Sequence, residues 1–470
     1  MNREHPGPAE TPFWKSYPIL LVIQLVVTWL NRGHVHEQGM FQNLIMDTAV
    51  WFRGGPLSDS PTYPMWGYPA LVALAPNITI LLILQSAVGA IAPAMLLPHL
   101  ERRFPAHRRL ARVLVFAGIP WFVFASVKWP VGFGISIAVV AMILFAEAIE
   151  RNSLKRVAAA GLVMGIALNV RSDPILILPG LFVLSLLLLA ARRPRVLPVR
   201  AAGLFWAVAW ICLIPWALYY RHWTGAYSLT SSNGYFVAYT VLGQLPNNPW
   251  GAVNDDDWGL EFLKERGYTG HSFGHGGNEI MKREFINAVR THPGAFAQKV
   301  IRNMTRVYLG GFYNGDPRIS AQQDSALDIA REKIKLAVGV NPNNEEIAGY
   351  RASGRWETLR PAPMTLAALG YLVMAAAAGI LFIFMATAGV VVARQRIFTD
   401  PLLFLSLVTI LYQIVIVIGV LKYEPRFMNA VYPYLLPFVI ALWASLTIAW
   451  RQRRARRRAA TAPSPSTVAA

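Results

Sequence analysis

Isolated cations interrupt several short segments that are otherwise apolar and aromatic. They are Lys128 in VKWP, Arg171 in VRSDP, Arg221 in YYRHW, and Lys422 and Arg426 in LKYEPRF. Charged side chains at membrane depth are costly, so they usually mark a pathway or a site. Because Arg and Lys bind phosphate through charge-assisted hydrogen bonds, we predict that these residues share one phosphate- or pyrophosphate-binding site. Each cation taken alone could instead extend to a lipid headgroup.

Carboxylates occupy similar positions. Glu37 and Asp47 belong to the segment HEQGMFQNLIMDTAVWF, and Asp173 follows two residues after Arg171. A carboxylate beside a bound phosphate can accept a proton from an incoming hydroxyl or amine. Glu37 and Asp47 are therefore candidate catalytic bases, and Asp173 is a candidate substrate-binding residue.

An aromatic- and proline-rich turn, SPTYPMWGYP, follows these acids. Its Tyr63, Trp66 and Tyr68 can stack on a sugar or an acceptor, although an aromatic belt at the membrane interface has the same composition. The oxygen ligands that a divalent cation prefers are available at Glu37, Asp47, Asp59 and Asp173. Such an ion is allowed, but we assign no metal ligands and no certain cofactor.

The composition indicates which elements must position these residues. The chain has 470 residues, of which 55% are apolar and only 15% charged, and this excludes an ordinary soluble enzyme. Runs of about 18 apolar residues can span a bilayer as helices. Such runs lie at roughly 13–30, 78–97, 110–127, 132–149, 156–170, 174–191, 201–220, 364–393, 402–421 and 428–449. We therefore predict an all-α polytopic membrane protein with about ten transmembrane helices. The single cysteine, Cys212, excludes a disulfide framework.

Lysine and arginine concentrate at both ends of the chain and in some of the segments between these runs. These segments are 1–15, 98–112, 150–156, 192–200, 394–400 and 450–470. Because basic residues are enriched in cytoplasmic loops, both termini are predicted to be cytoplasmic. The net charge of +19 is then a topology signal, and no basic face on a folded domain indicates nucleic-acid binding. Residues 451–470 are predicted to form a disordered basic tail.

Two long segments are predicted to lie on the opposite, extracytoplasmic side. Segment 31–77 belongs to an N-terminal transmembrane module, residues 1–220, and contains an amphipathic helix suited to the membrane surface. Residues 221–361 form a mostly helical insert between the seventh and eighth predicted helices, and residues 362–450 hold the C-terminal helices. The histidines of the loop GHSFGHGGN in the insert are interpreted as part of a surface loop, not as metal ligands.

Four stretches of sequence carry a family resemblance. They are HEQGMFQNLIMDTAVWFRGG with SPTYPMWGYPALVAL, GLVMGIALNVRSDPILILPGL, IPWALYYRHWTGAYSLTSSNGYFVAY and YEPRFMNAVYPYLLPFVIAL. In this order, from about residue 31 to 445, they resemble the GT-C glycosyltransferases, specifically the branch of the protein O-mannosyltransferases and the lipid A aminoarabinose transferase (glycosyltransferase family 39). The chain departs from the family pattern at Met65-Trp66, where two prolines are expected, and at Ser172-Asp173, which is inserted before a proline.

The resemblance implies transfer of a sugar from a polyprenyl-phosphate-linked donor to a cell-envelope acceptor (a lipid, polysaccharide or protein). The reaction would take place on the extracytoplasmic face of a bacterial inner membrane, with membrane lipids as the surroundings. Glu37 matches the family's catalytic carboxylate, and Asp47 is the next candidate. The five cations named above, chiefly Arg171 and Arg426, would bind the donor phosphate.

Other functions stay open at this point. A lipid or sugar transporter or flippase would place polar residues near the middle of the bilayer, whereas here they cluster at one end of clean apolar runs. An accessory membrane protein without activity fits the same composition. A polymerase or ligase that uses a diphosphate-linked donor would differ only in the second phosphate. No P-loop, dinucleotide-binding fingerprint, nucleophile elbow or HExxH motif is present.

Overall fold

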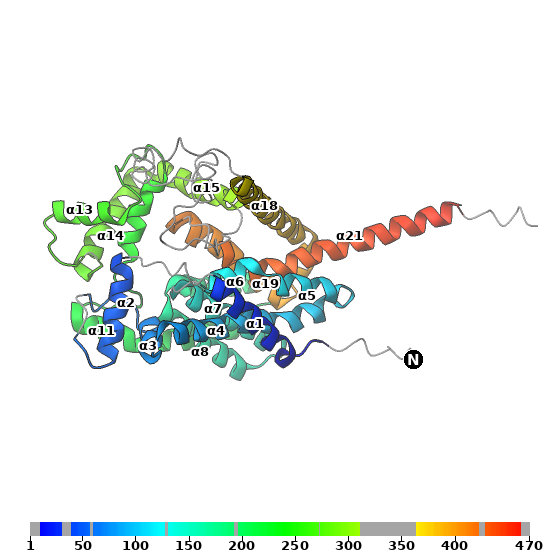
Figure 1. The fold of residues 1–470 in the computed structure, drawn as a ribbon, viewed down its shortest axis with the longest axis horizontal. Helices are drawn as coiled ribbons and strands as arrows, with labels where there is room; N and C mark the ends of the chain where they lie inside the picture. The colour runs from blue at the N-terminus through cyan, green and yellow to red at the C-terminus, as the bar shows by residue number, and fades with distance from the viewer. Residues whose placement is uncertain are drawn as a thin grey trace, which may run out of the picture.

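A computed structural model describes residues 10–30, 39–56, 60–126, 130–191, 196–271, 273–310, 363–422 and 428–461. In these residues the fold is entirely helical, without strands (Figure 1). The first part of the chain forms α1 (Phe13–Leu30), α2 (Gly39–Phe52), α3 (Gly67–Leu74), α4 (Ile78–Arg103), α5 (Arg108–Phe116), α6 (Ile119–Ser126), α7 (Pro130–Glu150), α8 (Leu154–Val170), α9 (Ile177–Ala190), α10 (Val199–Ile211) and α11 (Ile214–Thr224).

Within the described residues, six helical stretches are long and apolar enough to cross a membrane. They are Ile78–Arg103, Pro130–Glu150, Asp173–Ala190, Ala377–Ile397, Pro401–Leu421 and Tyr432–Arg458, and α10 with α11 makes a seventh if this pair, bent by 44°, counts as one span. An α-helical membrane architecture is therefore supported, but the predicted ten spans are not confirmed. The run 110–127 is divided between α5 and α6, and α8 has only 17 residues.

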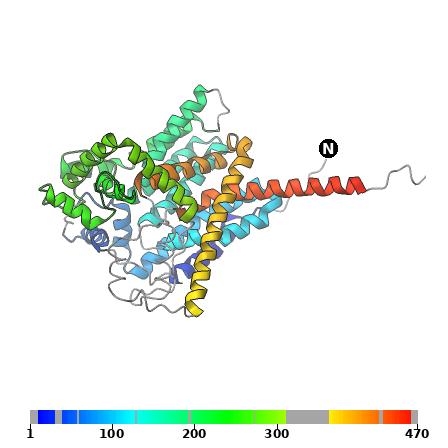
Figure 2. The ribbon, with the colours of Figure 1, turned by 90° about the horizontal axis from the view of Figure 1, so that it is seen from above.

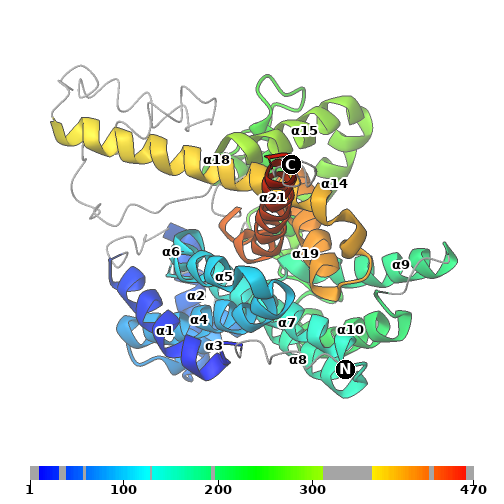
Figure 3. The ribbon, with the colours of Figure 1, turned by 90° about the vertical axis from the view of Figure 1, so that its right-hand side faces the viewer.

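Neighbouring helices of the N-terminal part pack in the order α1, α4, α7, α8, α10, α9. Figure 3, which looks along the long axis of the molecule, has α1 and α9 on opposite sides. Small residues allow close approach: a side chain at Gly165 of α8 would meet the Cys212 Sγ atom at 2.6 Å. Because lipid provides no hydrophobic drive between helices, such close backbone packing is a main source of association.

The described part of the insert is helical. It contains α12 (Gly234–Thr240), α13 (Asp256–Glu265), α14 (His275–Thr291) and α15 (Pro293–Gly310). Its apolar core includes Phe236, Leu263 and Met281, together with Leu44 from α2 and Tyr63 from the aromatic turn. The described helices of the insert thus pack with α2 and the aromatic turn, while residues 311–362 lie outside the described residues.

The C-terminal part contains α18 (Pro363–Ile397), α19 (Pro401–Tyr412), the π-helix η5 (Gln413–Leu421) and α21 (Tyr432–Thr461). Figure 2 shows α18 crossing α21, and a side chain at Gly389 would come within 1.9 Å of the Phe438 carbonyl oxygen. The described portion of the predicted disordered tail, residues 451–461, instead continues α21, which extends beyond the bundle (Figure 1).

One end of the bundle, here called the Arg103 end, is dense in ion pairs. Arg103 contacts Glu150 and lies 2.7 Å from Asp400, while Arg112 lies 2.6 Å from the fully buried Glu101. These contacts join α4, α5, α7 and α19 at their ends. Segments 98–112, 150–156 and 394–400, which charge counting assigns to one side of the membrane, therefore do meet on one face of the molecule.

Candidate functional site

The opposite end of the bundle, here called the Arg171 end, carries a single described ion pair from the predicted site. Arg171 ends α8, and Asp173 begins the short 3₁₀ helix η3 (Asp173–Leu176). Their side chains form an ion pair and are 23% and 22% exposed. The pair thus stands at the rim of the bundle, where partial burial strengthens its field and partial exposure leaves it accessible. The 21-residue α7 runs between the two ends, a length of about 30 Å.

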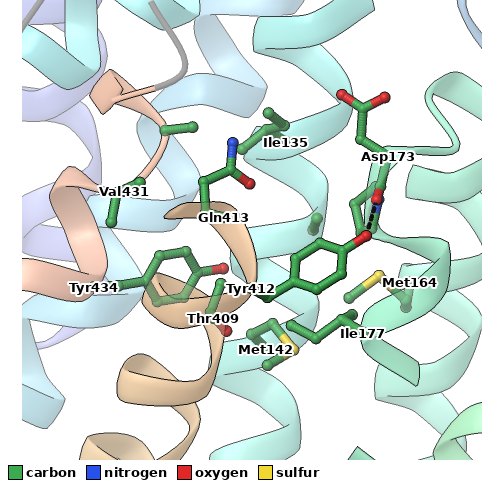
Figure 4. A pocket seen from close by; sticks show the side chains of 13 residues that line it. Ile135, Met142, Met164, Asp173, Ile177, Thr409, Tyr412, Gln413, Val431 and Tyr434 are labelled. Atoms are coloured by element: carbon green, nitrogen blue, oxygen red, sulfur yellow. Dashed lines mark hydrogen bonds between the residues drawn. The ribbon is translucent and has the colours of Figure 1, made fainter. Parts of the chain in front are cut away.

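A pocket lies beside this ion pair (Figure 4). Its lining comes from five α-helices, from η3 and η5, and from the residues just before α21, and consists of Ile135, Ala138, Met142, Met164, Asp173, Pro174, Ile177, Thr409, Tyr412, Gln413, Ala430, Val431 and Tyr434. In Figure 4 the carboxylate of Asp173 and the amide of Gln413 point toward the same end, and Met142 and Ile177 lie at the other. The pocket is therefore mostly apolar, with the hydroxyls of Thr409 and Tyr434 along its length and the polar groups of Asp173 and Gln413 at its Arg171 end.

A hydrogen bond between distant segments fixes the polar end of the pocket. The Tyr412 hydroxyl donates to the backbone carbonyl of Asp173 (Figure 4). Tyr412 is the last residue of α19 and Gln413 is the first of η5. The end of α19 and the start of η3 are thus joined at the mouth of the pocket, so its shape depends on both elements.

The three aromatic residues of the turn lie in different environments. Tyr63 is buried against Phe273, with ring centroids 5.0 Å apart. Burial raises the pKa of Tyr63, and the charge of Arg171 acts in the opposite direction, so the two residues are electrostatic neighbours. Trp66 is partly buried and packs on Tyr219, with centroids 4.7 Å apart. The structure thus brings Tyr63 toward the Arg171 end.

Tyr68 lies in a different environment from its two aromatic neighbours. It is buried, and its hydroxyl donates to the Gln85 side chain over 3.2 Å. Its ring packs near Phe133. Tyr68 therefore holds α3 against α4 and α7, and its hydroxyl already has a protein partner.

The remaining predicted residues are scattered. Arg221 is exposed and lies over the ring of Tyr227, 4.6 Å from its centroid. Lys422 follows directly after η5, and Asp47 is exposed on α2. Four residues lie outside the described residues: Glu37, Asp59, Lys128 and Arg426. The structure thus joins Arg171 with Asp173, and leaves the predicted five-cation site untested.

Sequence reasoning missed a buried lysine. Lys299 of α15 is fully buried, and burial lowers the pKa of its amine to about 7. Asn303 and Arg306 are also buried. The spacing of these residues, four and then three, places them on one face of a helix, and this spacing is the signal that could have found them. Tyr412 and Gln413 were missed too, although they are polar residues within the apolar run LYQIVIVIGVL.

Metal binding finds no geometric support in the part of the chain that is described. No group of three or more His, Cys, Asp and Glu side chains comes together there. Asp173, the one described acid at the pocket, is paired with Arg171.

Comparison of the chain with protein-family models, with curated proteins and with solved structures finds no match.

Proposed function

We propose that this chain is an integral-membrane glycosyltransferase that moves a sugar from a polyprenyl-phosphate-linked donor to a cell-envelope acceptor. The observation that carries the proposal is the mostly apolar pocket lined at its polar end by Asp173, the ion-pair partner of Arg171. An isoprenoid chain matches the apolar lining, and its phosphate matches a guanidinium. The order of motifs along the sequence agrees with this assignment.

In the proposed reaction, an acceptor hydroxyl or amine attacks C1 of the sugar from the face opposite the phosphate. The bond between C1 and the phosphate oxygen breaks, and polyprenyl phosphate leaves with the electron pair. Arg171 would stabilise the negative charge that develops on this leaving group. Glu37 would take the acceptor's proton. Extracytoplasmic orientation and a bacterial inner membrane belong to the same proposal.

Donor binding tests the role of the cation. Farnesyl phosphate, a short polyprenyl phosphate, is titrated into the purified protein in lipid nanodiscs. We expect Arg171→Ala to weaken binding by about 1–3 kcal/mol, the cost of losing a hydrogen bond to a charged group. Arg156→Ala, at the Arg103 end and 48% exposed, is the matched control and should bind as the wild type does. Equal affinity of all three proteins would contradict the assignment of Arg171.

Turnover tests the base. Glu37→Gln keeps the side-chain size but removes the proton acceptor, so transfer from a polyprenyl-phosphate sugar should nearly stop while farnesyl phosphate binding persists. Retention of about a third of the wild-type rate would exclude Glu37 as the base.

A second candidate function is a lipid transporter or flippase. Two features favour it: the 44° bend between α10 and α11, and the π-helix beside the pocket. Transporters bind substrates at interrupted helices of this kind. Movement of a fluorescent polyprenyl phosphate between leaflets of proteoliposomes, without sugar transfer, would favour this function over the first.

A further inference from the structure

The amine of Lys299 has an uncommon set of partners. It donates to three successive backbone carbonyls at the end of η5: Gly419 at 3.2 Å, Val420 at 2.6 Å and Leu421 at 2.6 Å. One turn along α15, the Asn303 amide donates to the Ile418 carbonyl at 3.2 Å and to the Gln244 side chain at 2.9 Å. Side chains of α15 therefore bind four consecutive carbonyls of η5.

These contacts provide hydrogen-bond donors for the carbonyls at a helix end. The last carbonyls of a helix have no partner within the helix, and a buried acceptor left without one costs about 1–3 kcal/mol. A π-helix is rare and is usually a single turn, whereas η5 is nine residues long. By supplying donors to carbonyls 418–421, α15 stabilises η5 at the point where it ends.

The other end of η5 reaches the pocket. Gln413, its first residue, lines the pocket, and Tyr412 just before it donates to the Asp173 carbonyl (Figure 4). Conversion of a π-helix to an α-helix shifts its register by one residue, which turns side chains on one side of the change by about 100°. The register that Lys299 holds at one end therefore bears on where Gln413 points at the other.

We propose that Lys299 is a positioning residue, whose three carbonyl contacts hold the π-helical register that directs Gln413 into the pocket beside Asp173. The ligand part of this inference depends on the proposed function, because it concerns the binding of a polyprenyl phosphate. Helix α15 would then link the insert to the pocket through η5.

Hydrogen exchange tests the helix register without any ligand. Lys299→Met removes the donors while keeping a side chain of similar length, and Lys282→Met is the matched control. Lys282 lies on neighbouring α14, partly exposed and 3.3 Å from Glu279. In the full-length protein in nanodiscs, we expect exchange in residues 413–422 to be at least tenfold faster in Lys299→Met and unchanged in Lys282→Met. Unchanged exchange in Lys299→Met would overturn the inference.

Kinetics test the link to the pocket. Lys299→Met should raise the KM for a polyprenyl-phosphate sugar and the Kd for farnesyl phosphate about tenfold, with kcat within about threefold of the wild type. Lys299→Arg, which keeps charged donors, should restore part of the affinity. A purely structural role would lower the active fraction with KM unchanged, and that result would overturn the inference.

If Lys299→Met does not fold, the milder change Lys299→Gln replaces it in both experiments. Its neutral, shorter side chain has two donors in place of three and cannot keep all three carbonyl contacts, so faster exchange in 413–422 is expected again, and unchanged exchange would overturn the inference. If the wild type binds no farnesyl phosphate, the proposed function and the ligand part fail together. Hydrogen exchange alone then decides whether Lys299 sets the register.

Discussion

The two ends of the bundle treat charge differently. At the Arg103 end, acids and bases from several helices pair with one another: Arg103 joins α4 to Glu150 of α7 and to Asp400 before α19. On the other side of the bundle, three cations in the described residues are arranged differently. Arg171 pairs with an acid two residues away, Arg221 stacks on a tyrosine, and Lys299 binds backbone carbonyls.

We expect the charges at the Arg103 end to stabilise the helix bundle, and Arg171 at the other end to bind a ligand. Ion pairs between residues of different helices cross-link those helices, as at the Arg103 end. The pair between Arg171 and Asp173 joins residues only two positions apart, so we expect replacement of Arg171 to change ligand binding more than stability. Mutations at the two ends should therefore separate stability from ligand binding.

The largest expected effect on stability is at the Arg103 end. Arg103 is only 11% exposed, and removing one partner of a buried pair costs about 3–5 kcal/mol. We expect Arg103→Ala to lower the free energy of unfolding by about 3 kcal/mol without changing the Kd for farnesyl phosphate. Denaturant unfolding of the purified protein measures the first, and titration the second. An equal loss in Arg156→Ala, whose side chain is 48% exposed, would show that the network acts only through net charge.

A smaller loss of stability is expected on mutation of Tyr68, and this mutation tests whether Tyr68 belongs to the ligand site. Tyr68→Phe removes the hydroxyl that donates to Gln85, and the net value of such a bond is about 1 kcal/mol. Stability should fall by this amount while the rate of sugar transfer stays within twofold of the wild type. A tenfold slower transfer at unchanged stability would instead assign Tyr68 to substrate binding.

The smallest effect belongs to an exposed pair at the Arg103 end. Glu10 accepts from Arg102 over 3.0 Å, and this bond lowers the pKa of Glu10 below its ordinary value of 4.5. Because the pKa of Glu10 is lowered in the folded protein, its charged side chain stabilises the fold at pH values above the ordinary pKa. This stabilisation is lost as the pH falls through the lowered pKa. Both side chains are well exposed, so Glu10→Gln should cost less than about 1 kcal/mol at neutral pH and nothing in strong acid. Thermal unfolding at pH 7 and at pH 3 measures this; a cost that does not change with pH would contradict it.

The sequence predicts the helical class and the position of Arg171 and Asp173 well, because an apolar run must end where charge begins. The predicted ten spans stay unconfirmed, and apolar content alone does not report breaks: Gly118 separates α5 from α6 within one apolar run. The sequence could not predict that Lys299 binds one end of the helix whose other end holds Gln413. The positions of these two residues relative to each other depend on the π-helical register of η5, and hydrophobic periodicity does not encode this register.

The long final helix has a practical consequence. His107 and Thr447 lie 3.4 Å apart at the Arg103 end, and α21 continues from there to Thr461, a further length of about 20 Å. Its arginines, from Arg451 to Arg458, are exposed along this stretch. A fluorophore placed near residue 458 would thus sit on a stiff, positively charged helix that extends away from the bundle, and would report on the surroundings of this end without contacting the bundle.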